Sequence, residues 1–261
     1  MIVLRSLVSA FLMYSKIPMP RVEWRDENRR YALCFFPLIG AVVGGVFLLW
    51  RWLCRCVGVG TLLNAAVCAA IPIVITGGIH LDGFCDVSDA VSSHAERSKK
   101  LGILSDPHIG AFAVIKLAVY VLIQAALFSE MPLFHAEIVV AIGFVLSRAL
   151  SGLAAVCFRN AKGIGSLWAF TEPAHKTVTL IVLGIITTLC AVSMTVISPL
   201  CGGFAVIAGA AAFIYYRLSA YRNFGGITGD TAGWFLQVCE IMILAAVVIG
   251  EKAGGDVQWL W

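Results

Sequence analysis

Three aspartates lie close together in an otherwise apolar region of the chain. Asp82, Asp86 and Asp89 occur in the stretch GGIHLDGFCDVSDAVSS, residues 77–93. Their i, i+4, i+7 spacing places all three carboxylates on one stripe if this segment is a helix. Like charges on one stripe repel each other unless a cation lies among them, and Mg²⁺ prefers oxygen ligands shared between carboxylates, water and substrate phosphates. The spacing therefore predicts a Mg²⁺ site, with a solvated acidic helix as the alternative.

A second polar stretch, NFGGITGDTAG, residues 223–233, is rich in glycine. Such a loop can turn successive N–H groups toward an anion. Asp230 could hold a metal ion that bridges to phosphate. The alternative is a flexible connection between helices, capped by Asp230.

Two further polar residues lie beside these motifs. His80 comes just before the first aspartate and could be a ligand, a proton shuttle or an interfacial side chain. Asp106, in ILSDPHIGAF, lies where the next apolar segment begins, and an acid there is also an ordinary helix cap. We expect it to take part in chemistry if the connection folds back onto the aspartates.

Charged residues inside apolar segments are also candidates. Arg148 and Glu240 both interrupt such segments, and a charge at the bilayer centre costs at least ~2.5 kcal/mol. They either line a polar cavity or form a structural pair with each other. Arg159 and Lys162, in the loop 158–176, could neutralise a diphosphate or simply mark the cytoplasmic side.

The composition identifies the elements that must position these groups. The 261 residues are 60% hydrophobic and 13% charged, which predicts an integral membrane protein. Residues 1–15 predict an N-terminal interfacial or re-entrant helix. We expect an all-α, polytopic helical bundle that forms one membrane-embedded catalytic domain over 1–261. The seven predicted transmembrane segments are 31–50, 61–77, 109–128, 136–157, 177–197, 203–219 and 234–250.

Basic residues predict the orientation of the bundle. Most Lys and Arg residues lie in 16–30, 78–108, 158–176 and 217–233, which seven spans would place on one side. We therefore expect these segments, and an active site among them, to face the cytoplasm. The net charge of +4 then reflects topology, and no nucleic-acid partner is expected.

The glycines predict close helix packing, and the cysteines are expected to be structural. Gly40 and Gly44 are four residues apart, a spacing that lets two membrane helices pack closely. The nine cysteines lack a C-x-x-C pair and are expected to be reduced.

Five stretches together resemble the cobalamin synthase family, adenosylcobinamide-GDP ribazoletransferase. They follow the family's order and are followed in turn by Glu240. These stretches are IPMP at 17–20, FPLIG at 36–40, GGIHLDGFCDVSDA at 77–90, SDPHIGAF at 105–112 and GGITGDTAG at 225–233.

The resemblance implies a Mg²⁺-dependent enzyme of the inner membrane. Its substrates would be adenosylcobinamide-GDP and α-ribazole or α-ribazole 5′-phosphate, and its products adenosylcobalamin or its phosphate and GMP. It implies that Asp82, Asp86 and Asp89 carry the metal and that Asp106 assists. The loop residues that it assigns to the same site are Gly225, Gly226, Thr228, Gly229 and Asp230. A homo-oligomer, or an association with other enzymes of cobalamin assembly, stays open.

The chain departs from the family pattern at two positions. Where the family commonly has a basic residue, this chain has Ser105, so any phosphate contact made by that residue must be supplied in another way. Ala90 replaces a glycine that often follows the third aspartate.

Other functions are weighed against this one. A membrane prenyltransferase would also bind Mg²⁺-diphosphate but is expected to have a second aspartate-rich motif, and GGITGD supplies only Asp230. A CDP-alcohol phosphotransferase would need an arginine soon after Asp82-Gly83, where this chain has none. An ion-coupled transporter could use Asp106, Arg148 and Glu240, but the acids cluster toward one face.

Overall fold

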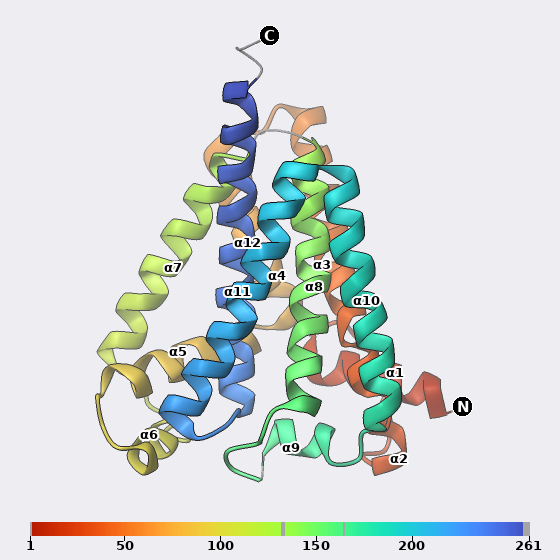
Figure 1. Ribbon diagram of the computed structural model, residues 1–261, viewed down its shortest axis with the longest axis vertical. Helices are drawn as coiled ribbons and strands as arrows, with labels where there is room; N and C mark the ends of the chain where they lie inside the picture. Colours follow the sequence, from red (N-terminus) through yellow and green to blue (C-terminus); the bar gives the residue numbers. More distant parts are fainter. Residues whose placement is uncertain (1, 132–133, 164, 258–261) are drawn as a thin grey trace.

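A computed structural model describes residues 2–131, 134–163 and 165–257, and this part of the chain is helical without a β-strand. Figure 1 shows the helices packed into an elongated bundle. The helices are α1 (Ile2–Tyr14), α2 (Asp26–Arg29), α3 (Ala32–Val57), α4 (Thr61–Thr76), α5 (Ile79–Ser92), α6 (Arg97–Ile103), α7 (Ala111–Ser129), α8 (Phe134–Cys157), α9 (Ser166–Thr171), α10 (Lys176–Ile197), α11 (Pro199–Phe224) and α12 (Gly229–Val257).

The chain is a multi-pass membrane protein. Six described helices are long and apolar enough to span a bilayer, namely α3, α7, α8, α10, α11 and α12. The α4–α5 pair passes the same test together but is bent by 97° between its two parts. The expectation of about seven spans is therefore confirmed, with α4 accounting for the predicted segment 61–77.

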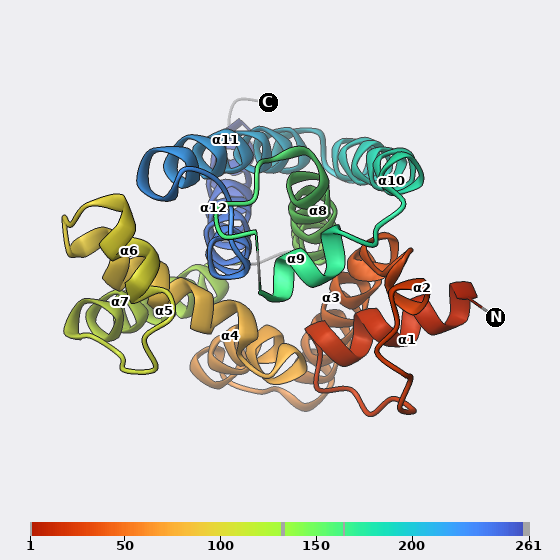
Figure 2. The same cartoon turned by 90° about the horizontal axis from the view of Figure 1, so that it is seen from below.

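The segments that are rich in Lys and Arg all lie at one end of the bundle. In Figure 1 this is the lower end, where α1, α2, α6, α9 and the α11–α12 connection are found. The α3–α4 and α10–α11 connections lie at the opposite, upper end. The view from below shows α1 running across the bundle beside α3, as expected for an interfacial helix (Figure 2).

Close packing of α3 against α8 depends on two glycines. A Cβ atom on Gly40 would lie 2.2 Å from the carbonyl oxygen of Phe144, and one on Gly44 would lie 2.7 Å from that of Ala141. Neither distance is compatible with a side chain, so the two helix backbones touch. The packing predicted from the spacing of these glycines is confirmed.

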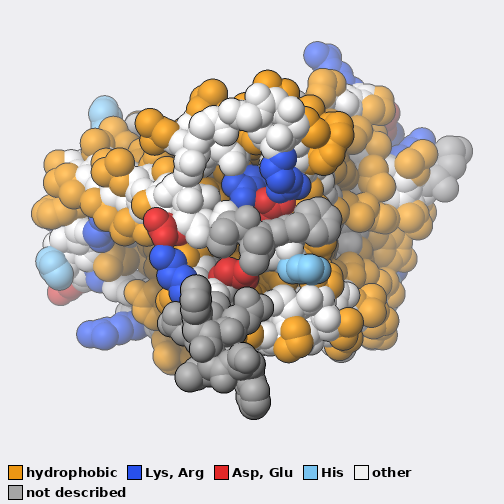
Figure 3. Space-filling model, turned by 90° about the horizontal axis from the view of Figure 1, so that it is seen from above, with side chains coloured by type: hydrophobic (Ala, Val, Ile, Leu, Met, Phe, Trp, Pro, Cys, Tyr) orange, Lys and Arg blue, Asp and Glu red, His pale blue; other side chains and the backbone are white. Residues whose placement is uncertain are grey.

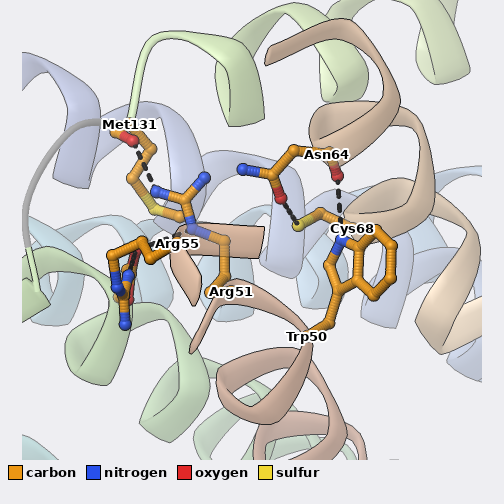
Figure 4. A network of polar contacts seen from close by, with 7 residues as sticks. Trp50, Arg51, Arg55, Asn64, Cys68 and Met131 are labelled. Carbon is orange, nitrogen blue, oxygen red and sulfur yellow. Dashed lines mark hydrogen bonds and ion pairs between the residues drawn. The ribbon is translucent and has the colours of Figure 1, made fainter. Parts of the chain in front are cut away.

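The upper end is held together by a buried ion cluster. Glu137 is fully buried and accepts hydrogen bonds from Arg51 Nε and from Arg55 Nη1, each at 2.7 Å. Arg51 also donates to the carbonyl oxygen of Met131 at 2.9 Å (Figure 4). Seen from above, charged side chains of both signs lie side by side near the centre of this end, and hydrophobic side chains dominate around them (Figure 3). The single carboxylate of Glu137 thus balances one of the two positive charges of Arg51 and Arg55. All nine cysteines of the chain are free.

Candidate active site

A sharp break between α4 and α5 places the aspartate stripe across the lower end. Gly77 and Gly78 adopt left-handed conformations, with φ of 66° and 79°, which favour glycine. Helix α4 ends there, and α5 leaves at 97° to it, so α5 runs across the bundle instead of spanning it (Figure 1). The condition for a stripe of three carboxylates is met, because the segment forms helix α5 over Ile79–Ser92.

Two glycines bring α5 against the first turns of α12. A Cβ atom on Gly83 would lie 2.6 Å from the carbonyl oxygen of Asp230, and one on Gly233 would lie 3.0 Å from that of His80. The backbones of α5 and α12 therefore touch at two points. This contact brings Asp230, about 140 residues further along the chain, to the aspartate stripe.

The side-chain carboxylates of two members of the stripe, Asp82 and Asp86, have no hydrogen bond or ion pair with any other residue that the structure describes. Burial raises the pKa of Asp86 to about 7, and the negative charges of Asp82, Asp230 and Asp89 add to this effect. Lys162 opposes the rise. A cation would relieve this repulsion.

The donor set suits Mg²⁺ bound together with a substrate. No group of three His, Cys, Asp or Glu side chains within the described ranges has the geometry to hold a metal by itself. Mg²⁺ is usually held by one or two carboxylates, with water and phosphate oxygens completing its octahedron. The unpartnered carboxylates of Asp82 and Asp86 fit that pattern, because they leave the remaining positions to a diphosphate.

The third member of the stripe has a structural partner. Asp89 accepts a hydrogen bond from Gly110 N at 2.6 Å and another from Ala113 N at 2.8 Å. These N–H groups belong to the start of α7, so Asp89 caps that helix from a neighbouring one. Each of its oxygens has a backbone donor, which distinguishes it from Asp82 and Asp86.

Asp106 lies apart from the stripe. Its side chain is 52% exposed in the α6–α7 connection and bonds to Nδ1 of His108 at 2.7 Å. The backbone N–H of His108 also donates to it, and together these bonds lower the pKa of Asp106. Among the described residues it forms no hydrogen bond or ion pair with the other aspartates.

The glycine-rich loop is paired with the loop that follows α8. Ile227 N donates to Arg159 O, and Ala161 N donates to Ile227 O, both at 2.8 Å. Gly226 permits this pairing, because a Cβ atom there would lie 2.3 Å from Arg159 O. Gly225, with φ of 79°, ends α11.

Several N–H groups of this loop have partners within the protein. Gly225 N donates to Tyr221 O, and Thr228 N donates to Thr231 Oγ1 at 2.8 Å. The hydroxyl of Thr228 accepts from Thr231 N at 3.2 Å and lies 3.4 Å from the carboxylate of Asp230. The first turn of α12, which begins at Gly229, is thus fixed beside α5.

Lys162 brings a positive charge to the site. Its Nζ atom donates to Ser105 Oγ at 2.9 Å and lies 3.8 Å from Asp230 Oδ2. An ammonium group therefore lies at position 105, where the resembled family commonly has a basic residue, but it comes from another loop. The side chain of Arg159 is exposed nearby, and its backbone joins the two loops.

Arg148 and Glu240 form a buried ion pair between α8 and α12. The same arginine nitrogen donates to Phe144 O and to Ser147 Oγ, each at 3.0 Å. A Cβ atom on Gly40 would lie 2.8 Å from Arg148 Cδ, so this glycine makes room for the arginine. The two charges thus pair with each other inside the bundle, as the structural alternative expected.

His80 is buried and faces a cavity next to the aspartates. The cavity measures about 260 Å³, and Asp82 and Asp230 also line it. Burial lowers the pKa of His80 to about 3, with a smaller effect from Arg148, so the imidazole is neutral. Tyr14 and Phe36 complete the wall, although neither was a site candidate in the sequence. Their isolated positions in apolar segments carry no signal that could have identified them.

Comparisons with known proteins agree on one family. The family model described as cobalamin-5-phosphate synthase matches residues 6–248. An adenosylcobinamide-GDP ribazoletransferase of Lachnoclostridium phytofermentans is 47% identical over 248 residues, which cover 95% of each chain. The protein of the same name from Clostridium perfringens (strain 13 / Type A) is 31% identical over 87% of this chain and 91% of its own. The one from Clostridium botulinum (strain Alaska E43 / Type E3) is 30% identical over 91% of this chain and 94% of its own. No solved structure matches the chain.

Proposed function

The chain belongs to the cobalamin-5-phosphate synthase family, and we propose on this basis that it is an adenosylcobinamide-GDP ribazoletransferase. It joins adenosylcobinamide-GDP to α-ribazole or α-ribazole 5′-phosphate and releases GMP. The observation that carries this proposal is the 47% identity over 95% of the chain to an enzyme of that name. The charged site on α5 and α12 suits the diphosphate of such a substrate.

Asp82 and Asp86 are the proposed ligands of Mg²⁺. Both carboxylates lack a protein partner among the described residues, and both lie on the stripe, where burial and, to a smaller extent, like charges raise the pKa of Asp86. Bound there, Mg²⁺ would neutralise the diphosphate and the charge that develops on the leaving group. Asp89 supports this pair of ligands by holding α5 against α7.

Asp230 and Lys162 are proposed to assist the transfer of the cobinamide phosphate to the ribazole. The 3′-hydroxyl of the ribazole attacks the phosphorus attached to cobinamide, a new O–P bond forms, and the bond from that phosphorus to the GMP oxygen breaks. Asp230 accepts the hydroxyl proton, because it faces the stripe from α12 and lines the same cavity as His80. Lys162, 3.8 Å from Asp230, stabilises the phosphate charge.

The site is proposed to face the cytoplasm from a bacterial inner membrane. The segments that contain most of the basic residues all lie at the lower end together with α5 (Figure 1). Positive charge is enriched in cytoplasmic loops, because such loops are translocated less readily. Nucleotide substrates would reach the aspartates from that side.

The test of this function is the reaction itself. Purified protein in detergent is mixed with adenosylcobinamide-GDP and α-ribazole, and GMP and the corrinoid product are measured with Mg²⁺ and with excess chelator. We expect both products in equal amounts, and only with the metal. A folded preparation that releases no GMP with either ribazole or its phosphate would rule out the proposal.

A further inference from the structure

The cavity beside His80 is mainly apolar although it adjoins the charged site. Asp82, Asp230 and His80 line one part of it. Side chains from α1, α3, α9 and α12 line the rest, namely Met13, Tyr14, Phe36, Leu167 and Leu236. Its volume of about 260 Å³ is just below the range of roughly 300–1,000 Å³ that is usual for small-molecule pockets. It therefore has room for one ring system but not for a corrinoid or a whole nucleotide.

Three aromatic rings form a corner of this cavity. The ring centroids of Tyr14 and Phe36 lie 4.4 Å apart. The imidazole of His80 is stacked with Tyr14 at 6.4 Å and meets Phe36 edge-on at 5.9 Å. Aromatic side chains arranged in this way bind flat rings by offset stacking and edge contacts. The shape of the wall therefore favours a planar ligand.

His80, which lines the cavity, also has a buried polar atom without a partner. His80 is 5% exposed, and its Nε2 atom has no hydrogen bond to any residue that the structure describes. A buried polar atom without a partner is costly, so it indicates a missing hydrogen-bond partner. Apart from His80 and the two carboxylates, the side chains that line the cavity are apolar, so the ligand should offer few polar atoms to the rest of the wall.

Guanine and dimethylbenzimidazole, the bases of the two substrates, differ in how many hydrogen-bonding atoms they have. The guanine of adenosylcobinamide-GDP has several donors and acceptors on its edges. The carboxylates of Asp82 and Asp230 could pair with its N–H donors, but the apolar walls would leave its acceptors O6 and N7 largely unpaired. The dimethylbenzimidazole of α-ribazole has a single ring nitrogen free to accept a hydrogen bond. In the tautomer with the proton on Nε2, His80 offers one buried N–H donor, which together with the apolar walls matches the second base.

We propose that this cavity binds the benzimidazole base of the ribazole substrate, with Nε2–H of His80 donating to its free ring nitrogen. Tyr14 and Phe36 pack against the base. This assignment rests on the proposed function and specifies which part of which substrate the cavity takes. Because Asp82 and Asp230 border the same cavity, the ribose of a base bound there extends toward the carboxylates.

The proposal is tested with a substrate analogue that lacks only the hydrogen-bond acceptor. In this analogue, an indole riboside, the free ring nitrogen of α-ribazole is replaced by C–H. For the wild-type enzyme we expect the KM of the analogue to be roughly tenfold or more above that of α-ribazole, because it leaves Nε2–H unpaired. His80→Phe removes the donor, so it should raise the KM of α-ribazole and abolish the difference between the two nucleosides.

Two controls separate binding of the base from other effects. His80→Gln keeps an N–H donor of similar reach and should restore part of the preference for α-ribazole. The KM of adenosylcobinamide-GDP should stay within about twofold of wild type in both variants. GMP release by the wild-type enzyme tests the proposed function separately, so its failure would not be confused with failure of the cavity assignment.

Two results would overturn the assignment of the cavity to the benzimidazole. If His80→Phe raises the KM of adenosylcobinamide-GDP and leaves that of α-ribazole unchanged, the cavity does not bind the benzimidazole. Equal use of α-ribazole and the indole riboside by the active wild-type enzyme would also overturn it, because the proposed hydrogen bond would then be absent.

Discussion

The carboxylate of Asp89 accepts a hydrogen bond from the backbone N–H of Gly110 at 2.6 Å. A second bond, from Ala113 N, occupies its other oxygen. One aspartate of the stripe therefore joins α5 to the start of α7, and the carboxylates of the other two have no protein partner among the described residues. We therefore expect a structural role for Asp89 and a chemical role for Asp82 and Asp86.

Replacing Asp89 should mainly affect stability. Asp89→Ala removes the cap of α7 and should cost roughly 1–2 kcal/mol, measured as a lower melting temperature in detergent. Asp89→Asn keeps one acceptor oxygen and should retain most of the rate of GMP release. If Asp89→Asn is folded but as inactive as Asp82→Asn, Asp89 has a chemical role that capping does not explain.

Adding a side chain at Gly83 should move Asp230 on α12 away from the aspartates of α5. The added methyl group of Gly83→Ala would lie 2.6 Å from Asp230 O, so α12 must move away from α5. We expect kcat to fall by at least tenfold. Gly45→Ala is the matched control, because nothing lies within 4 Å of its added methyl group, and its activity should equal that of wild type. Normal activity of Gly83→Ala would show that Asp230 need not lie against α5.

A lysine at position 105 should replace the charge of Lys162. Lys162 Nζ already lies 2.9 Å from Ser105 Oγ. Lys162→Met should lower kcat roughly tenfold to a hundredfold by removing a cation near the phosphates, and adding Ser105→Lys should restore part of it. Lys176→Met changes an exposed lysine on α10 and serves as the control. Absence of rescue would mean that the position of the ammonium group, and not only its charge, is essential.

The raised pKa of Asp86 makes the metal-free protein sensitive to pH. Its pKa is about 7 in the folded chain but about 3.9 in an unfolded one, so the folded state binds the extra proton between these values. Stability without metal should therefore fall as the pH rises from about 4 to about 7. Mg²⁺ should raise the melting temperature most above pH 7, where the carboxylate is ionised. Asp86→Asn should remove this part of the pH dependence, and an unchanged profile would contradict the assignment.

Local patterns predicted much of the fold. Apolar length located the spans, because a helix in lipid must satisfy its own backbone groups. The i, i+4, i+7 spacing indicated one carboxylate stripe if the segment is a helix, which it is, and the spacing of Gly40 and Gly44 predicted a close helix contact, which is made with α8. Each of these sequence patterns lies within one helix.

Features that depend on the placement of distant segments were not predictable. The partners of Asp89 lie 21 and 24 residues away, and they are found only when α7 begins beside α5. Tyr14 and Phe36 reach His80 from two other helices. In the same way, Lys162 reaches position 105 only because the loop after α8 pairs with residues near Ile227.

Asp82 and Asp86 are proposed to hold a divalent cation. The most direct test is binding of Mn²⁺ to the purified protein, measured by the loss of the free-ion electron paramagnetic resonance signal, with competition by Mg²⁺. Glu96→Gln, which alters an exposed carboxylate at the same end, is the control. We predict saturable binding of Mn²⁺ to wild type and to Glu96→Gln. In folded Asp82→Asn and Asp86→Asn we predict at least tenfold weaker binding and a loss of GMP release of roughly a hundredfold. Equal Mn²⁺ binding and turnover in all four proteins would contradict the claim.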